Sequence, residues 1–309
     1  MDNKVKGSVK SQVYFLLNVL DGIGKSKKEM RSGSVILGEN GRQVSPLIHS
    51  YKYRNDIKNT ATQLLNFAKE DFNIKNAEYI DNDVIKSYIL KKLDAGVTYR
   101  SISTYIGHLR KIMLGLQKIS EYKEKKYKAF DEDGVKIISA LKKEKAYKTK
   151  YKNRAYVDVE NILSNLKNEE NILVAKVQLE AGVRVTEGLK FRLDQMKNNN
   201  QIEVKIKGGN TILVTVKENT YNVLLAKINK AIEKGEIGFR IQYDDYYSDL
   251  KQAVESTVET WNGTHGMRYV YAQRRMNELS SEMSFEEARL IVSKEMGHHR
   301  ANITSHYLG

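Results

Sequence analysis

Residues 179–191 have the sequence LEAGVRVTEGLKF, in which an arginine follows a glycine at the end of a helical pattern. The preceding residues, DVENILSNLKNEENILVAKVQLEAG, predict two short helices. Arg184 therefore stands where a helix stops, and Glu187 is close enough along the chain to orient its guanidinium. Taken alone, such an arginine is most often an ordinary surface residue paired with a carboxylate.

Two stretches farther along the chain carry polar side chains at structured positions. The segment QIEVKIKGGNTILVTV alternates apolar and polar residues around two glycines, which predicts a β-hairpin with Lys207 at its turn. Residues 264–275, THGMRYVYAQRR, place His265 and Arg268 three residues apart on one face of a helix. Each stretch alone is a weak signal, because turn lysines are usually solvated and His-x-x-Arg pairs are common by chance.

The chain ends in EMGHHRANITSHYLG, residues 295–309, with three histidines and then a tyrosine. A polar tail that frays is the simplest interpretation of such a segment. A metal site is a weaker interpretation, because His298 and His299 point to different sides of a helix and metal ligands must converge. Tyr307 is one of 19 tyrosines, and its type alone does not distinguish it.

Composition limits the chemistry that is available. The chain has 309 residues, of which 40% are apolar, enough for two domains with ordinary cores. Cysteine is absent, which excludes disulfides, a thiolate nucleophile and cysteine-bound zinc, and fits a reducing compartment. The longest early apolar stretch, VYFLLNVL at residues 13–20, is about half as long as a membrane span. A soluble cytoplasmic protein without a membrane anchor is expected.

Charge is distributed unevenly along the chain. The net charge is +14, from 52 Lys and Arg against 38 Asp and Glu. Residues 1–150 hold 30 basic and 17 acidic residues, whereas residues 151–309 hold 22 and 21. A basic half joined to a nearly neutral half predicts that the first half binds a polyanion and that the second has a more local task. The alternative is that the lysine-rich surface serves solubility.

Hydrophobic spacing predicts the organisation of the chain. Ser45 and Pro46 suit the cap and first turn of a helix, and three apolar stripes follow as far as about residue 118, the third with Thr98 as its cap. Lysine-rich residues 121–154 predict a linker that can follow a phosphate backbone. The expected divisions are an N-terminal extension of one helix and a loop (1–45), a helical domain (46–120), a basic linker (121–154) and a second, mostly helical domain (155–309).

The expected fold is mainly α, with an all-helical first domain and a mostly helical second domain that contains a small antiparallel β-sheet. In the second half, helical patterns recur at about residues 219–234, 244–260, 265–279 and 284–296. The side chains expected to contact DNA are Arg100, Arg110 and Lys111 on the outer side of the third stripe, and Lys148, Lys150, Lys152 and Arg154 in the linker.

Common catalytic motifs are missing from the sequence. It contains no phosphate-binding Gly-x-x-x-x-Gly-Lys loop and no dinucleotide-binding Gly-x-Gly-x-x-Gly fingerprint. The densest acidic stretch, DEDG at residues 131–134, lies in the predicted linker, where a solvated turn is the better interpretation. Because no carboxylate cluster for magnesium is evident, phosphate chemistry here is expected to use no metal and no cofactor. Side chains would then supply the cations, the nucleophile and the proton donor.

Together, these stretches resemble the tyrosine recombinase (phage integrase) family. AGVRVTEGLKF resembles its first-arginine box, Gly-Leu-Arg-Ile-Ser-Glu-Leu, and KIKGGNTILVTV resembles its catalytic-lysine hairpin. HGMRYVYA resembles its His-x-Leu-Arg-His-Thr-Phe-Ala box. MGHHRANITSHY resembles Leu-Gly-His followed, nine residues after the histidine, by the nucleophilic tyrosine. The likeness covers about residues 150–309, and the helical segment 47–118 resembles the family's core-binding domain. The resemblance therefore implies that residues 46–120 are a helical core DNA-binding domain and that residues 155–309 are a catalytic domain.

The chain departs from the family pattern in the second box and at the end. Met267, Tyr269 and Val270 replace a leucine, a histidine and a threonine or serine, for which altered packing without loss of activity is expected. In this family a tail after the tyrosine often docks on a neighbouring protomer, and here only Leu308 and Gly309 follow. Three explanations stay open: the chain is truncated, protomers contact each other in another way, or the natural end of the protein is short.

The resemblance implies a role for each matched residue. A phenol is a poor nucleophile at neutral pH, so neighbouring cations must favour its attack on the phosphate. The implied roles are Tyr307 as nucleophile, Arg184 and Arg268 as clamps on the non-bridging oxygens, His265 as proton acceptor or phosphate ligand, Lys207 as proton donor to the 5′ oxygen, His298 as a donor to the phosphate, and Glu187 as a supporting residue.

The resemblance implies a site-specific DNA recombinase, for integration or excision of a mobile element, that works through a covalent 3′-phosphotyrosine without metal or ATP. The implied partners are double-stranded DNA, gripped by a clamp of both domains, a homo-tetramer on two DNA sites, and accessory DNA-bending proteins. The alternatives are a non-catalytic sequence-specific DNA-binding protein with the same fold and a type IB topoisomerase. The target sequence, the direction of the reaction and the role of residues 1–45 stay open.

Overall fold

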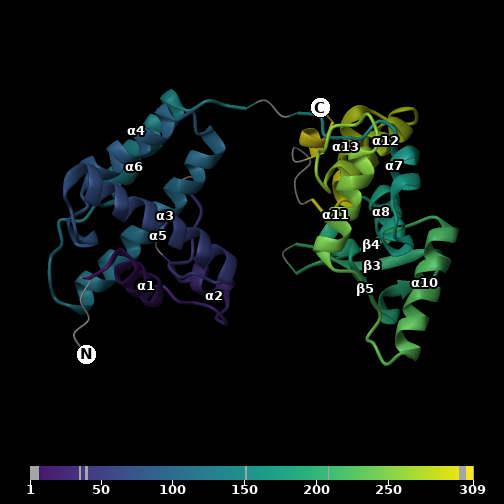
Figure 1. Cartoon of the computed structure of the whole chain (residues 1–309), viewed down its shortest axis with the longest axis horizontal. Coiled ribbons are helices and arrows are strands. Elements are labelled where there is room, and N and C mark those ends of the chain that lie inside the picture. Colours follow the sequence, from purple (N-terminus) through teal and green to yellow (C-terminus); the bar gives the residue numbers. More distant parts are fainter. Residues whose placement is uncertain are drawn as a thin grey trace. The chain divides into compact units, whose positions relative to one another are not determined.

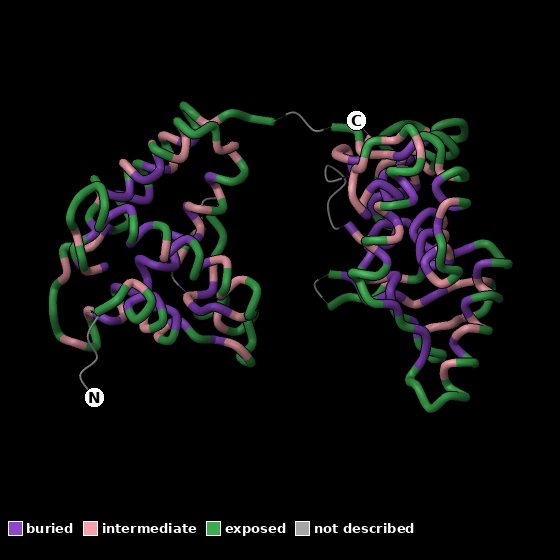
Figure 2. Tube along the Cα trace, viewed as in Figure 1, coloured by how far each residue is buried: buried purple, intermediate pink, exposed green. Residues whose placement is uncertain are grey.

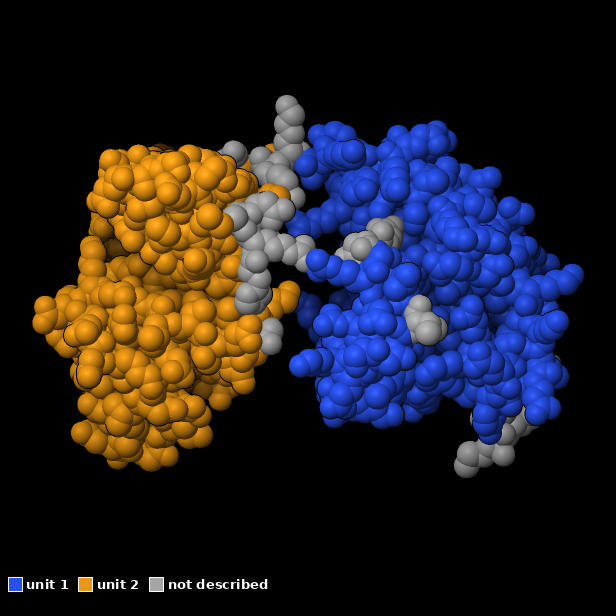
Figure 3. All heavy atoms as spheres, turned by 180° about the vertical axis from the view of Figure 1, so that it is seen from behind, with its two compact units in different colours: residues 1–150 blue, residues 151–309 orange. Residues whose placement is uncertain are grey.

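The computed structural model describes residues 7–34, 36–38, 41–149, 152–207, 209–298 and 304–308. The chain forms two compact units, Met1–Lys150 and Tyr151–Gly309, which are shown in blue and orange in Figure 3. Within the described residues, no helix is both long and apolar enough to cross a membrane. The two units are described separately below.

Unit 1 is helical and is built around one central helix. Its helices are α1 (Val9–Val19), α2 (Lys27–Ser32), α3 (Tyr51–Phe72), α4 (Asn82–Asp94), α5 (Tyr99–Tyr122) and α6 (Glu132–Lys145), with the 3₁₀ turn η1 (Ala77–Tyr79) (Figure 1). α5 contacts α1, α3, α4 and α6. The three predicted apolar stripes are buried in one core, and Thr98 caps α5 as expected by accepting from the Ser101 N–H.

Helix α3 begins later than predicted. Ser45 and Pro46 were expected to open it, but α3 starts at Tyr51, and Ser50 caps it by accepting from the Tyr53 N–H. The Ser45 hydroxyl instead accepts from the Leu47 N–H, within a turn whose Ile48 pairs with Asp21. A serine oxygen can stabilise a tight turn as well as a helix end, and here the turn wins because it buries Ile48 completely.

The segments predicted as an extension and a linker belong to the core of unit 1. Helix α1 buries Val13, Leu16 and Leu17, so residues 1–45 contain more than a peripheral extension. Residues 132–145, predicted as part of a linker, form α6, whose Val135 and Ile138 are fully buried. Two apolar residues three apart are enough to dock a lysine-rich helix, because the long lysine side chains can lie along its outer face.

The three acidic residues at positions 131–133 are exposed as expected, but the stretch opens helix α6, so the prediction of a turn is wrong. The Asp131 carboxylate accepts from the backbone N–H groups of Asp133 and Gly134 and from the Asn82 side chain. These hydrogen bonds, with the one from Asn82 the strongest, lower the pKa of Asp131. Negative charge at a helix N-terminus also suits the helix dipole.

Unit 2 is mostly helical with a small antiparallel sheet, as predicted. Its helices are α7 (Val159–Asn165), α8 (Glu169–Ala181), α9 (Val185–Gly188), α10 (Glu218–Glu233), α11 (Tyr243–Glu255), α12 (Gly266–Ser280) and α13 (Phe285–Glu295). The predicted hairpin is confirmed as β3 (Gln201–Lys205) paired with β4 (Thr211–Thr215). β2 (Met196–Lys197) extends it in the order β2-β3-β4, and β1 (Lys190–Phe191) pairs with β5 (Phe239–Arg240).

The buried residues of unit 2, which lie in its interior in Figure 2, belong to two clusters. The larger one surrounds α8, which contacts α9, α10, α11, α12 and β4. The smaller one joins α12, α13 and the short 3₁₀ turn η3 (Ser305–Tyr307) at the end of the chain. Helix α12 therefore has one side against the main core and the other against the C-terminal segment.

Candidate active site

Arg184 is positioned by the end of helix α8. Gly182 ends this helix with a left-handed backbone (φ +61°), and a Cβ there would lie 2.3 Å from the ring of Tyr271. Arg184 then precedes α9, where Glu187 accepts from its backbone N–H (2.7 Å) and from its Nη1 (2.8 Å). The Glu187 side chain is 6% exposed. The predicted contact of Glu187 with Arg184 is present, and this carboxylate holds both the backbone N–H and the guanidinium of Arg184.

Arg268 lies in the first turn of α12 and is completely buried. Its Nη1 donates to the Gly182 carbonyl, and its Nη2 donates to the Met296 carbonyl (2.6 Å) and to Nε2 of His298 (2.9 Å). Its Nε is buried and has no hydrogen-bond partner among the described residues. This one side chain therefore joins the end of α8 to the segment that follows α13.

The guanidinium of Arg268 is a buried cation, and no carboxylate pairs with it among the described residues. Burial lowers its pKa, and the nearby Tyr307 opposes that shift. A charge removed from water is costly unless an opposite charge or several dipoles compensate it. The two carbonyls and the imidazole that contact Arg268 compensate its buried charge only in part. An anion that binds beside this guanidinium would therefore be stabilised.

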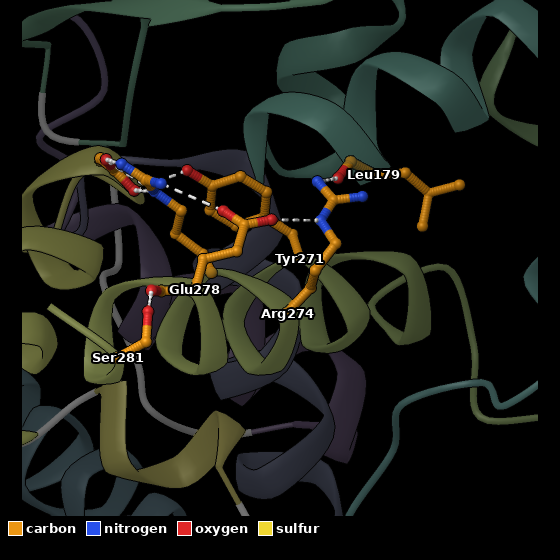
Figure 4. Close-up of polar contacts among 7 residues, drawn as sticks. Leu179, Tyr271, Arg274, Glu278 and Ser281 are labelled. Carbon is orange, nitrogen blue, oxygen red and sulfur yellow. Dashed lines mark hydrogen bonds and ion pairs between the residues drawn. The ribbon is translucent and has the colours of Figure 1, made fainter.

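A polar network that includes Tyr271, Arg274 and Glu278 of α12 holds this helix in place (Figure 4). Arg274 donates to the Leu179 carbonyl of α8 (2.7 Å), and its Nε lies 3.5 Å from a carboxylate oxygen of Glu278. The Tyr271 hydroxyl donates to Glu295 of α13 (2.8 Å). These contacts connect α12 to both neighbouring helices, which keeps Arg268 at a defined place.

His298 is buried beside Arg268. Because an arginine can only donate, Nε2 of His298 must accept from Arg268, and the proton of the neutral ring is then assigned to Nδ1, 3.3 Å from the Thr304 hydroxyl. The resemblance implied that His298 donates to a phosphate. In this structure it accepts from Arg268 instead, so the implied role stays a prediction.

Tyr307 packs into the same place. Its side chain is on η3 and 9% exposed, and its ring centroid lies 5.6 Å from Cζ of Arg268 and 5.4 Å from the His298 ring. The ring of Tyr269, where the family pattern has a histidine, lies 4.5 Å away. The described part of the C-terminal segment is therefore docked, and the interpretation as a fraying tail is wrong for it. The nine-residue step from His298 to Tyr307 brings both rings to Arg268.

His265 stands directly before α12 and is half-buried. Burial lowers its pKa, and the positive charges of Arg268, Arg154 and Arg184 lower it further, while Glu187 opposes them. A lowered pKa keeps the imidazole neutral at pH 7, so the ring can accept a proton. That state suits the role of proton acceptor implied by the resemblance.

We expect the titration midpoint of His265 to lie below 6.5, the ordinary value for histidine. Arg154→Gln should raise the midpoint, because it removes one of the positive charges that disfavour the imidazolium. Since the folded state binds this proton less readily than the unfolded state, His265 reduces the free energy of unfolding as the pH falls below 6.5. Side-chain ¹H–¹⁵N NMR measures the midpoint.

The control for this titration is Arg192→Gln, which removes an exposed arginine paired with Asp194. It should leave the His265 midpoint unchanged, because Arg192 is not among the charges that shift it. A midpoint at or above 6.5 in the unaltered protein would contradict the electrostatic picture of the site.

Lys207 is exposed at the turn after β3, apart from the buried residues. The base of its hairpin is nevertheless attached to the site. Ile206 is buried, and a Cβ on Gly297 would lie 2.9 Å from its Cδ1, so the hairpin packs directly against the residue before His298. Direct contacts join Arg268, His298 and Tyr307, and the charges of Arg184 and Arg268 act on His265, whereas Lys207 is exposed at the hairpin turn.

The residues predicted to contact DNA have different surroundings. Lys111 is not on the outer side of α5: it is buried and donates to the Ser45 carbonyl, and burial lowers its pKa to about 8. Arg110 is 12% exposed and pairs with Glu132 (2.9 Å). The expected outer position is wrong for Lys111, because other elements of unit 1 pack over this part of α5. Contact of Arg110 or Lys111 with DNA stays a prediction.

The linker residues also differ from one another. Arg154 donates from Nε to the Asn262 carbonyl (2.9 Å) and lies over the Tyr269 ring, so it is part of unit 2 and not a free linker side chain. Arg100, Lys148 and Lys152 are exposed, and their contact with DNA stays a prediction. Lys150 and His299 lie outside the described residues. Among the described residues, no three metal-ligating side chains lie close enough together to hold a metal ion.

Gln273 is a contact residue of the site that the sequence did not reveal. Its Nε2 donates both to the Tyr307 carbonyl (2.9 Å) and to Oδ1 of Asn153 (2.8 Å). Arg289 of α13 donates to the Ser305 hydroxyl (3.1 Å). The backbone around Tyr307 is therefore held by two helices. No motif marks Gln273, because its importance depends on where the chain end docks.

Replacing Gln273 by methionine should loosen the segment Thr304–Leu308. The loss of one hydrogen bond, about 1 kcal/mol, should raise amide hydrogen exchange there about fivefold. Hydrogen–deuterium exchange with mass spectrometry measures this, with the exposed Gln252→Met on α11 as the matched control. Equal exchange in both variants would show that Gln273 does not hold the segment.

No family model matches the sequence, and no curated protein matches it either. The structure, by contrast, resembles that of a lambda integrase dimer bound to a COC′ core site, with TM-score 0.59 and 11% identity over 84% of this chain and 72% of that chain. The chain has the tyrosine recombinase fold.

Two further recombinase structures match nearly the whole chain. The XerH site-specific recombinase bound to difH substrate, in a pre-cleavage complex, has TM-score 0.53 and 14% identity over 98% of this chain and 94% of that chain. The Tn1549 transposon integrase in complex with a circular intermediate DNA has TM-score 0.56 and 12% identity over 98% and 95%. The fold implied by the four sequence motifs is therefore confirmed.

Proposed function

We propose that this protein is a site-specific DNA recombinase that cuts and rejoins DNA through Tyr307. The observation that carries the proposal is the packing of Tyr307 against Arg268, a buried cation that no described carboxylate neutralises. A nucleophile next to an anion-binding position is the minimum that phosphoryl transfer requires. The DNA-bound recombinases of similar fold support the same substrate class.

In the proposed reaction, the scissile phosphate binds between Arg184 and Arg268, whose planar guanidinium groups suit its non-bridging oxygens. The Tyr307 oxygen attacks phosphorus and gives its proton to neutral His265. The bond to the 5′ oxygen breaks, and Lys207 protonates that oxygen. The 3′ phosphate remains on Tyr307, and the 5′ hydroxyl of another strand reverses the steps.

In the proposed reaction, the covalent step removes the need for a nucleotide. A phosphotyrosyl bond keeps the free energy of the phosphodiester that it replaces, so rejoining needs no ATP.

We further propose that the protein integrates or excises a mobile element, and that four protomers act on two DNA sites with two of them active at a time. The proposal also includes unit 1 as the core-binding domain, a clamp of both units on DNA, and accessory DNA-bending proteins as further partners.

The test starts with DNA recovered by crosslinking to the protein, because sequencing that DNA identifies a target site. A nicked duplex that carries this site traps a covalent intermediate, since a short fragment leaves after cleavage and cannot rejoin. The expected result is a protein–DNA adduct on a denaturing gel, with the DNA on the Tyr307 peptide by mass spectrometry. Binding without an adduct would favour a non-catalytic DNA-binding protein, and relaxation of supercoiled DNA without the site would favour a topoisomerase.

A further inference from the structure

Gln178 is a completely buried polar residue on the inner side of α8. All parts of its amide have partners. The oxygen accepts from the Tyr246 hydroxyl (2.7 Å), and the nitrogen is 3.4 Å from each of two carbonyl oxygens, those of Val183 and Thr264. A buried amide of this kind is costly unless its hydrogen bonds are made.

The two carbonyls belong to the residues directly before two site residues. Val183 precedes Arg184, and Thr264 precedes His265. These segments are about 80 residues apart in sequence, and one side chain bonds to both. The amide nitrogen has two protons, one for each carbonyl, so the two bonds can exist together.

Tyr246 of α11 determines the orientation of this amide. Its side chain is also completely buried, and burial raises its pKa, which keeps the hydroxyl protonated and able to donate. A donor at the amide oxygen forces the nitrogen toward Val183 and Thr264. Methionine at position 178 would fill a similar volume but would leave all three polar groups without their partner.

We propose that Gln178 is a positioning residue that sets the separation of Arg184 and His265, and that Tyr246 orients it. The inference rests on the proposed function, because the two residues that it places act there on the same phosphate. Gln178 itself is too deeply buried to touch DNA. Its effect is on geometry, and small displacements of catalytic groups have large effects on rate.

The experiment compares Gln178→Met with the double variant Gln178→Met/Tyr246→Phe. The single change should lower Tm and reduce the single-turnover cleavage rate on the nicked substrate about 10- to 100-fold, with DNA binding within about twofold. The double variant should regain part of the lost Tm, because it removes the unpartnered hydroxyl. It should not regain the rate, because the two carbonyls still lack their common donor.

Val254→Ala is the matched control, because it truncates a fully buried residue of α11 away from the site. It should lower Tm while the cleavage rate stays within about threefold. The inference would be overturned by a double variant whose rate recovers together with Tm, by wild-type cleavage in Gln178→Met, or by an equal loss of rate in Val254→Ala.

A second readout separates this inference from the proposed function. The NMR midpoint of His265 should shift by at least a few tenths of a pH unit in Gln178→Met and in the double variant, but not in Val254→Ala, because only the first two move His265 relative to Arg184. If the wild type forms no covalent adduct, the proposed function is wrong. An unchanged His265 midpoint in Gln178→Met would instead overturn the positioning role.

Discussion

Phenylalanine at position 307 should abolish the covalent protein–DNA adduct, with a loss of at least about 10⁴-fold in cleavage rate. The change removes the attacking oxygen and leaves the ring, whose contacts with Tyr269 (4.5 Å) and Arg268 (5.6 Å) keep the segment docked. Tm and noncovalent DNA binding should therefore match those of the wild type. A denaturing gel with the nicked substrate measures the adduct.

The matched control for this variant is Tyr243→Phe, which removes the hydroxyl of an exposed tyrosine on α11. It should form the adduct at the wild-type rate. An adduct that persists in Tyr307→Phe would show that another residue is the nucleophile, and the proposed mechanism would then be wrong.

Lysine at position 268 should reduce the cleavage rate about 10²- to 10³-fold, equivalent to about 2.7–4 kcal/mol of transition-state stabilisation. The charge is kept, but a single ammonium cannot reach the carbonyls of Gly182 and Met296 and the His298 ring and also face a phosphate. The loss should appear in the rate of the chemical step. DNA binding should change much less, because many other cations contribute to it.

Arg274→Lys is the control for this prediction. Arg274 is on the same helix, but it faces Leu179 and Glu278 on the outer side. We expect its cleavage rate to stay within about threefold of the wild type in a single-turnover assay. Cleavage by Arg268→Lys within fivefold of the wild-type rate would show that no multidentate arginine contact is needed.

Much of the helical framework could be predicted, because hydrophobic spacing is a local property. The stripes through α3, α4 and α5 and the alternation around Gly209 required only neighbouring residues to be compared. Charge predicts the boundaries of the domains less well than hydrophobic spacing does. The lysine-rich segment near residue 140 was assigned to a linker, although Val135 and Ile138 dock it as α6.

The surroundings of single cations could not be predicted from the sequence. Lys111 and Arg154 look like any other basic residues, yet the first is covered by unit 1 and the second bonds to a loop more than 100 residues away. Exposure depends on which elements pack over a side chain, and that packing is decided by contacts distant in sequence.

The order and spacing of Arg184, Lys207, His265, Arg268, His298 and Tyr307 were sufficient to predict the fold and to select the candidate site, because a motif is a linear pattern. Their partners follow from tertiary structure alone. The acceptor state of His298, the two carbonyls on Arg268, and the roles of Gln178 and Gln273 all join segments distant in sequence. A hydrogen bond depends on distance and direction in space, and neither can be read from separation along the chain.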